Sequence, residues 1–318
     1  MRSRFSVIIT CYNQRGFIRE AVNSALQQAF GDPEIIVVDD GSSDGSLEIL
    51  KEYGARIKFV QMPGNGGAPR ARNLGASLAS GEYLVFLDGD DVLMPHALKL
   101  YDSIIEQRKP MMILAGIFRF SGQVPWSQLE EIVNRPLRFV EYSSPISKDR
   151  PADLSASATV VDRDTFFQVG GWTPDIFHGD NKDLMMKLGD AGPLILILEP
   201  KTTFYRVHAK NSIHDVSSFL KSACRLINNE RNGIYPGGSA HVFERYAALG
   251  VFASYWSIKG LGLGLWTEVL KVVLAGFPMI LAGIAYRCAV RLKLRSRPAE
   301  CIDWTDQNNK LLGKSQYT

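Results

Sequence analysis

Short apolar runs alternate with amphipathic stretches in the N-terminal part of the chain. The runs at Phe5–Thr10, Glu34–Val38, Ile57–Val60 and Tyr83–Leu87 are rich in β-branched residues and predict four buried strands. Between the first two runs, the apolar residues of 17–26 recur at spacings of three and four, which predicts a helix with one buried face. The chain therefore begins with a strand–helix–strand unit.

Further helices are predicted after Asp44 and over Ala68–Ala79, so strands and helices alternate and predict a doubly wound α/β sheet. Ligands of such sheets gather beyond the carboxyl ends of the strands. Acidic residues follow two of the predicted strands, at 39–40 and 88–91. We therefore expect the chemistry at the crevice where these two strand ends meet.

The pattern becomes less regular from about residue 111. Strands are predicted at Met112–Phe118, Ala158–Val161 and Leu194–Leu198, and a helix is predicted at Asp180–Gly189. These elements indicate that the α/β domain continues well beyond its first half.

The last eighty residues differ in character. Leu261–Tyr286 is strongly apolar and contains Trp266, but its uninterrupted part, Val272–Tyr286, is shorter than the roughly 20 residues that a membrane-spanning helix needs. One interpretation is an interfacial element that contacts an anionic membrane surface through 261–297. The other is a pair of helices that packs on the main domain. The basic residues after the apolar stretch are Arg287, Arg291, Lys293, Arg295 and Arg297.

Composition narrows the function classes. The chain is 46% hydrophobic and 22% charged, which is typical of a folded globular protein. The net charge of +3 is too small and dispersed for a nucleic-acid-binding protein. The four cysteines have no paired spacing, and the N-terminal residues have no room for a signal peptide, so we expect a cytoplasmic protein.

Three carboxylates stand together in Asp88-Gly89-Asp90-Asp91. They repel one another, and a divalent cation would relieve that repulsion. Oxygen ligands favour a hard ion, so Mg²⁺ or Mn²⁺ shared with substrate phosphates is the natural candidate. The alternative is a solvated acidic turn that caps a helix.

Two further motifs point to a nucleotide. The segment Asp39–Gly45 follows a strand and precedes a helix, and a carboxylate at Asp40 can accept hydrogen bonds from a base or a ribose, although a capping turn would have the same composition. The glycine-rich loop 64–73 brings Arg70 and Arg72 into a helix, where guanidinium groups suit phosphate or a base carbonyl. A flexible loop with surface arginines is the alternative.

Together these segments resemble the family 2 glycosyltransferases, which are inverting enzymes with the type A nucleotide-sugar-binding fold. The matching blocks are SVIITCYN at 6–13, EIIVVDDGSSDGS at 34–46, NGGAPRARNLG at 65–75 and SGEYLVFLDGDDVLMP at 80–95. The resemblance covers about residues 5–210 and implies a mixed, mostly parallel sheet. With it we expect a catalytic domain over 1–240, divided into a nucleotide-binding half (1–110) and an acceptor half (111–240), and a helical appendage over 241–318.

The resemblance also implies roles for individual residues. Thr10, Tyr12, Asp40 and Arg72 would surround the base and ribose, with Asp88 near the ribose and metal. Trp172, in a Gly-Gly-Trp turn, would stack on a sugar ring, and Asp90 and His208 would bind the metal. The full set for the nucleotide sugar is Thr10, Tyr12, Asn13, Asp40, Arg70, Arg72, Asp88 and Trp172.

The catalytic acid of the family falls in the segment Gly179–Leu184. Many members have two adjacent acids here, whereas this chain has Asp180 followed by Asn181. Asp180 is the first candidate for the base that deprotonates the acceptor hydroxyl, and Asp183 is the second. Helix capping is the structural alternative for Asp180.

The function that the resemblance implies is transfer of a sugar from a nucleotide diphospho-sugar, most often UDP-linked, to a hydroxyl of a glycan or lipid-linked acceptor, as in surface polysaccharide assembly. A catalytically silent nucleotide-sugar-binding or scaffold protein is the main alternative, because Asn181 replaces an acid. A nucleotidyltransferase has less support, because residues 10–16 lack that class's glycine- and arginine-rich loop.

Overall fold

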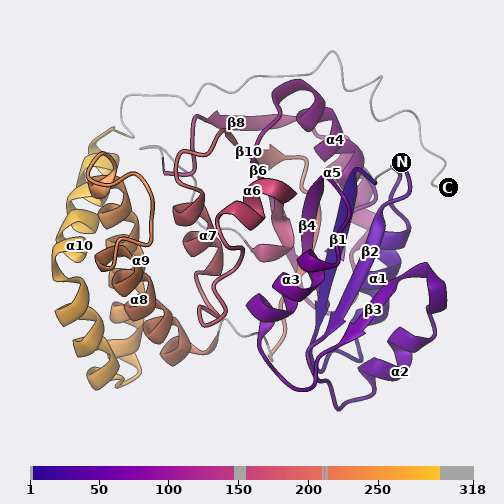
Figure 1. Ribbon diagram of the computed structural model, residues 1–318, viewed down its shortest axis with the longest axis horizontal. Helices are drawn as coiled ribbons and strands as arrows, with labels where there is room; N and C mark the ends of the chain where they lie inside the picture. Colours follow the sequence, from indigo (N-terminus) through magenta and orange to yellow (C-terminus); the bar gives the residue numbers. More distant parts are fainter. Residues whose placement is uncertain (1–2, 147–154, 210, 212–213, 294–318) are drawn as a thin grey trace.

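An eight-stranded mixed sheet forms the centre of the protein (Figure 1). The computed structural model describes residues 3–146, 155–209, 211 and 214–293. The strand order is β3-β2-β1-β4-β9-β6-β10-β8, with β9 antiparallel to both neighbours, β8 antiparallel to β10 and the other pairs parallel. The strands are β1 (Phe5–Cys11), β2 (Glu34–Asp39), β3 (Lys58–Gln61), β4 (Tyr83–Asp88), β6 (Met112–Ala115), β8 (Arg138–Tyr142), β9 (Thr159–Asp162) and β10 (Leu194–Glu199).

Helices cover both faces of this sheet, as the alternating sequence predicted. Successive residues of β1 point to opposite faces, so Val7 and Ile9 join one core and Ile8 joins the other. The first core is covered by α1 (Ile18–Leu26) and α4 (Ala97–Arg108), and the second by α3 (Ala68–Ser77), α6 (Arg163–Gln168) and α7 (Asp180–Leu188). Shorter helices are α2 (Ser46–Lys51) and α5 (Leu129–Val133). The expected doubly wound α/β fold is confirmed.

The predicted strand Met112–Phe118 is in fact two strands in two sheets. The chain turns at Gly116, where an added Cβ would lie 2.7 Å from the Cδ of Lys201. Beyond the turn, β7 (Ile117–Phe120) leaves the large sheet and pairs with β11 (Thr203–Arg206), which also pairs with β5 (Val92–Leu93). This small sheet places the end of β11 beside the acidic segment that precedes β5.

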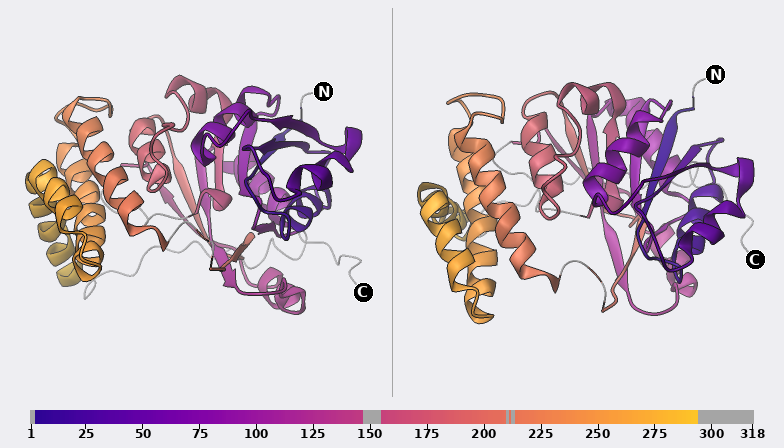
Figure 2. Two further views of the ribbon diagram at one scale, coloured as in Figure 1. Left: turned by 90° about the horizontal axis from the view of Figure 1, so that it is seen from below. Right: turned by 60° about the horizontal axis from the view of Figure 1, so that its bottom comes forward.

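Three long helices form a layer beside α7, well separated from β1–β3 (Figures 1 and 2). They are α8 (Val216–Arg231), α9 (Val242–Gly262) and α10 (Trp266–Lys293). They share a core of their own, which includes Leu226, Leu249 and Val272 and which Met186 of α7 joins. The helical appendage is therefore confirmed, and α8, which precedes the expected boundary at residue 240, packs with it.

Helix α10 is longer than the uninterrupted apolar run Val272–Tyr286. Within the described part of the chain it is the one helix, over Trp266–Cys288, that is long and apolar enough to cross a membrane. Only 28% of that window is buried inside the protein. The expectation that this segment is too short to span is corrected, although length and composition alone are weak evidence for a span.

Candidate active site

A cavity of about 870 Å³ opens at the carboxyl ends of β1, β2 and β4. The register of the sheet sets Thr10 beside Asp88 and Cys11 beside Asp39, so the acidic strand ends meet as the sequence predicted. The residues that follow β11 form part of the wall. The charged and polar lining includes Thr10, Tyr12, Asn13, Asp40, Arg72, Asp88, Asp90, His178, Tyr205, His208 and Asn211.

Asp40 holds the glycine-rich loop against the end of β2. Its two carboxylate oxygens accept hydrogen bonds from the backbone N–H groups of Gly66 and Gly67, both at 2.7 Å. Burial raises the pKa of this carboxyl. The loop is thereby fixed at the mouth of the cavity, and Asp40 still lines it.

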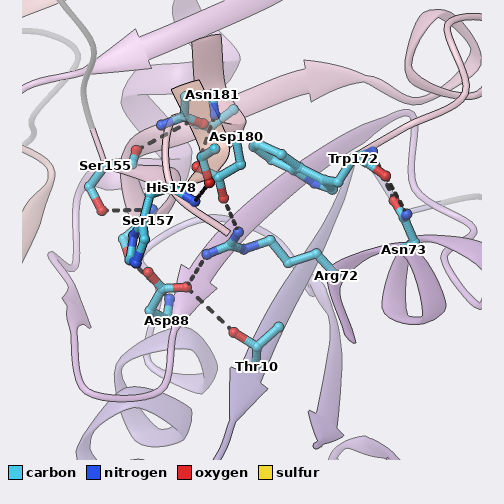
Figure 3. Close-up of polar contacts among 12 residues, drawn as sticks. Thr10, Arg72, Asn73, Asp88, Ser155, Ser157, Trp172, His178, Asp180 and Asn181 are labelled. Atoms are coloured by element: carbon cyan, nitrogen blue, oxygen red, sulfur yellow. Dashed lines mark hydrogen bonds and ion pairs between the residues drawn. The ribbon is translucent and has the colours of Figure 1, made fainter. Parts of the chain in front are cut away.

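Arg72 lies between two carboxylates at the back of the cavity (Figure 3). Its Nη2 donates to Asp88 Oδ1 at 2.7 Å and its Nη1 to Asp180 Oδ2 at 2.6 Å. Burial acts against the charged form, but Asp88 and Asp180 outweigh it and raise the pKa of the guanidinium. Arg72 therefore stays charged and connects β4 to the start of α7.

Asp90, between β4 and β5, faces His208, which follows β11. The distance from His208 Nε2 to Asp90 Oδ2 is 2.9 Å, and the imidazole stacks on Phe17 with ring centroids 4.9 Å apart. Arg206, at the end of β11, donates from Nε to the Asp90 carbonyl oxygen at 2.9 Å. The backbone N–H of Arg206 donates to Asp91 Oδ1, also at 2.9 Å. Asp91 is buried, so its carboxylate holds the end of β11 in place.

These residues fit a divalent cation that is shared with a substrate. No group of three or more His, Cys, Asp or Glu side chains is arranged around a metal position within the described ranges. Asp90 and His208 nevertheless present one oxygen and one nitrogen ligand at the cavity wall. Burial, followed by the charge of Asp88, raises the pKa of the Asp90 carboxyl, and a bound cation would act against both effects. Mg²⁺ and Mn²⁺ sites commonly combine one or two protein ligands with substrate phosphates and water.

The candidate bases occupy different environments. Asp180 is the first residue of α7 and is only partly buried; Gly179, not Asp180, is the N-cap residue. Burial raises the pKa of its carboxyl. Asn181 is buried and accepts a hydrogen bond from Thr159 Oγ1 at 3.2 Å.

Asp183, the second candidate base, is a structural residue. Its carboxylate is buried and accepts hydrogen bonds from Tyr235 at 2.8 Å, Asn229 at 3.1 Å and Thr173 at 2.5 Å. These contacts link α7 to the helical layer. Neither Asp183 nor Asp180 is among the residues that line the cavity, but Asp180 contacts the lining residue Arg72, whereas Asp183 faces the helical layer. Because this carboxylate is buried and occupied by three donors, we do not propose Asp183 as the base.

Two residues expected at the nucleotide sugar lie elsewhere. Trp172 is fully buried against Phe86 and cannot stack on a sugar; its ring lies 5.2 Å from Arg72 Cζ and supports the guanidinium. Arg70 is half exposed and pairs with Asp175 at 3.2 Å, away from the cavity lining. Arg70 lies outside the cavity because helix α3 turns Arg72 inward and Arg70 outward, whereas Trp172 is enclosed by Phe86 and Phe166.

The cavity also contains residues that the sequence analysis did not single out. Phe17 contacts both His208 and Arg206, whose guanidinium carbon lies 4.8 Å from its ring centroid. His178 stacks on Phe219, and burial lowers the pKa of its imidazole, so it is neutral near pH 7. Arg206 precedes the predicted metal ligand His208 by two residues, in Tyr205-Arg206-Val207-His208, and this proximity in sequence was the available signal.

The sequence model of Glycosyl transferase family 2 matches residues 6–165, half of the chain. The chain belongs to this family. Among curated relatives, the uncharacterized glycosyltransferase EpsJ of Bacillus subtilis is 37% identical over 120 residues, which cover 37% of this chain and 35% of EpsJ. The poly(ribitol-phosphate) β-N-acetylglucosaminyltransferase TarS of Staphylococcus aureus is 31% identical over 170 residues, which cover 52% of this chain and 29% of TarS. This family 2 chain thus matches about a third of the length of these relatives.

Solved structures support the fold of this family 2 member. A crystal structure of a fragment of Staphylococcus aureus TarS superposes with a TM-score of 0.65 at 20% identity, covering 88% of this chain and 80% of the fragment. The mannosyltransferase PcManGT from Pyrobaculum calidifontis, solved with GDP-Man and Mn²⁺, gives a TM-score of 0.52 at 15% identity, covering 92% of this chain and 87% of PcManGT.

Replacing Arg72 tests the ion-pair arrangement. Arg72→Met should lower the free energy of unfolding by about 3 kcal/mol, because two partly buried carboxylates lose their buried cation. Arg70→Met is the matched control, since its exposed ion pair should contribute less than about 1 kcal/mol. Urea denaturation followed by circular dichroism measures both changes. Equal effects of the two substitutions would contradict the assignment.

Proposed function

We propose that this protein transfers a sugar from a nucleotide diphospho-sugar to a hydroxyl of a glycan or lipid-linked acceptor in the cytoplasm. The observation that carries the proposal is the cavity at the strand ends, where Asp40, Arg72 and Asp88 are close to the pair Asp90–His208. One end of the cavity offers groups that hydrogen-bond to a base and ribose. The other offers ligands for a metal-bound diphosphate.

We propose UDP as the nucleotide and a hexosyl or N-acetylhexosaminyl group as the sugar. Crystal structures of TarS with UDP-GlcNAc and with UDP share the fold of this chain, which supports this choice. PcManGT, solved with GDP-Man, shares the fold at a lower TM-score. GDP is therefore the nucleotide whose binding should be compared with that of UDP. The putative teichuronic acid biosynthesis glycosyltransferase TuaG, 36% identical over 138 residues, supports an acceptor in surface polysaccharide assembly.

In the proposed mechanism, Asp90 and His208 would hold Mg²⁺ or Mn²⁺, which would supply positive charge to the departing diphosphate. Arg72 and Asp40 orient the nucleotide, and Thr10, Tyr12, Asn13 and Asp88 complete its site. Asp180 takes the proton of the acceptor hydroxyl. The acceptor oxygen bonds to the anomeric carbon as the bond from that carbon to the diphosphate breaks, so the configuration inverts.

Asp180 is our choice for the base because it borders Arg72 at the back of the cavity and keeps partial access to solvent. Asn181 accepts a hydrogen bond from Thr159, and its amide cannot take up a proton at neutral pH. The second candidate function, a silent nucleotide-sugar-binding protein, is favoured by this Asn181 contact alone.

Calorimetric titration with UDP and with GDP, each with Mn²⁺ or with EDTA, tests the sugar-donor site. We expect UDP to bind in a metal-dependent way. Asp90→Asn should weaken that binding about tenfold or more, since a lost contact to a charged group costs about 1.5–3 kcal/mol. Asp175→Asn, an exposed acid outside the cavity, is the control. Absence of UDP binding under every condition would remove the proposal.

The base is tested by UDP release from UDP-GlcNAc or UDP-glucose, with water as the acceptor. Asp180→Asn should lower the rate about 10²- to 10⁴-fold while the titration with UDP still shows binding. Asp175→Asn should leave the rate unchanged. If Asp180→Asn keeps the wild-type rate, the base is another group, and His178→Phe becomes the next variant. If the wild-type protein binds UDP-sugars without any release, the silent binding protein is the better description.

A further inference from the structure

The outward face of α10 is a continuous apolar stripe. Six large side chains recur there at spacings of three and four, as one face of a helix requires. Leu274 is 71% exposed and Phe277 is 56% exposed, although both are large apolar residues. Between residues 272 and 286 the helix carries no charged residue. The stripe consists of Trp266, Leu270, Leu274, Phe277, Leu281 and Ile284.

The opposite face of α10 is firmly packed on α9 and α8. Val272 and Met279 are buried in the core of the helical layer. At the crossing of α9 and α10 the backbones touch, since a Cβ added to Gly250 would lie 1.7 Å from the carbonyl oxygen of Met279. The same layer is fixed internally by the buried ion pair between Arg245 and Glu230, at 2.7 Å. The apolar stripe is thus held outward by a rigid support.

Positive charge is concentrated in the same part of the chain. Residues 246–298, which follow the buried Arg245, contain seven Lys or Arg and one acidic residue, Glu268, a net charge of +6, whereas the whole chain carries +3. The remainder of the chain is therefore net negative. Four of these cations follow the last residue of the stripe, Ile284, in the sequence. They are Arg291, Lys293, Arg295 and Arg297.

We propose that the stripe of α10 docks on an anionic membrane surface, with the helix lying in the interface. Apolar side chains enter the boundary between head groups and acyl chains, and the basic residues attract anionic lipids. Trp266 at one end of the stripe suits the interfacial region. The helix lies on the membrane and does not cross it, because crossing would separate Val272, Met279 and Gly283 from α9.

A second copy of the chain is the other candidate occupant. Two copies that pair their stripes would also pair two strongly basic parts of the chain. The repulsion between their like charges opposes this pairing. Anionic lipid is the partner whose charge complements the segment. The proposal does not depend on the proposed sugar transfer.

Flotation of the full-length chain with vesicles tests the proposal. We expect the chain to float with vesicles of phosphatidylcholine and phosphatidylglycerol and to float less with phosphatidylcholine alone. The triple variant Leu274→Gln, Phe277→Gln, Leu281→Gln should lower the partition coefficient about tenfold or more, because each large apolar side chain loses its transfer free energy. The matched control is Leu78→Gln, Trp126→Gln, Phe167→Gln, which removes three exposed apolar side chains elsewhere and should float like the wild type.

Three outcomes would overturn the proposal. The wild-type chain could fail to float with either kind of vesicle, or the control variant could lose binding as strongly as the stripe variant. Resistance of the bound chain to alkaline carbonate extraction would show a spanning helix. If the chain fails to float and sedimentation shows a dimer that the stripe variant converts to a monomer, the stripe is an interface between copies. Titration of the same samples with UDP tests the sugar-donor site independently, so failure of membrane binding is distinguished from failure of nucleotide binding.

Discussion

The buried guanidinium of Arg72 joins the two halves of the α/β domain. It stands on α3 in the first half, and its two carboxylate partners are Asp88, at the end of β4, and Asp180, at the start of α7. Trp172 packs on the same guanidinium from the second half. Because a buried cation needs its anions close by, this one group fixes the distance between the strand ends that line the cavity and the helix that carries the candidate base.

The acidic segment after β4 shows how neighbouring carboxylates can take different tasks. Asp88 pairs with Arg72, Asp90 faces His208, and Asp91 is buried and holds the backbone of Arg206. The small sheet makes this division possible, because β11 runs beside β5 and delivers Arg206 and His208 to the acids. The three neighbouring carboxylates would repel one another in an isolated turn, and here each one has a separate hydrogen-bonding partner.

Much of this arrangement could be predicted from the sequence, because parallel strands end at one edge and the acids follow the strands directly. The environments of Trp172 and Asp183 could not. Trp172 is buried by Phe86, and Asp183 by Tyr235, and such contacts between distant segments leave no local periodic signal. The division of Met112–Phe118 likewise depends on two distant partners, since β6 pairs with β10 and β7 pairs with β11.

A crystal structure of the full-length protein with UDP and Mn²⁺ tests the central claim most directly. The account predicts the uracil and ribose beside Asp40 and Arg72, and the metal between Asp90 and the diphosphate. It also predicts that Asp180 remains beside the cavity while the nucleotide is bound. A nucleotide bound outside this cavity, or a metal bound without Asp90, would contradict the account.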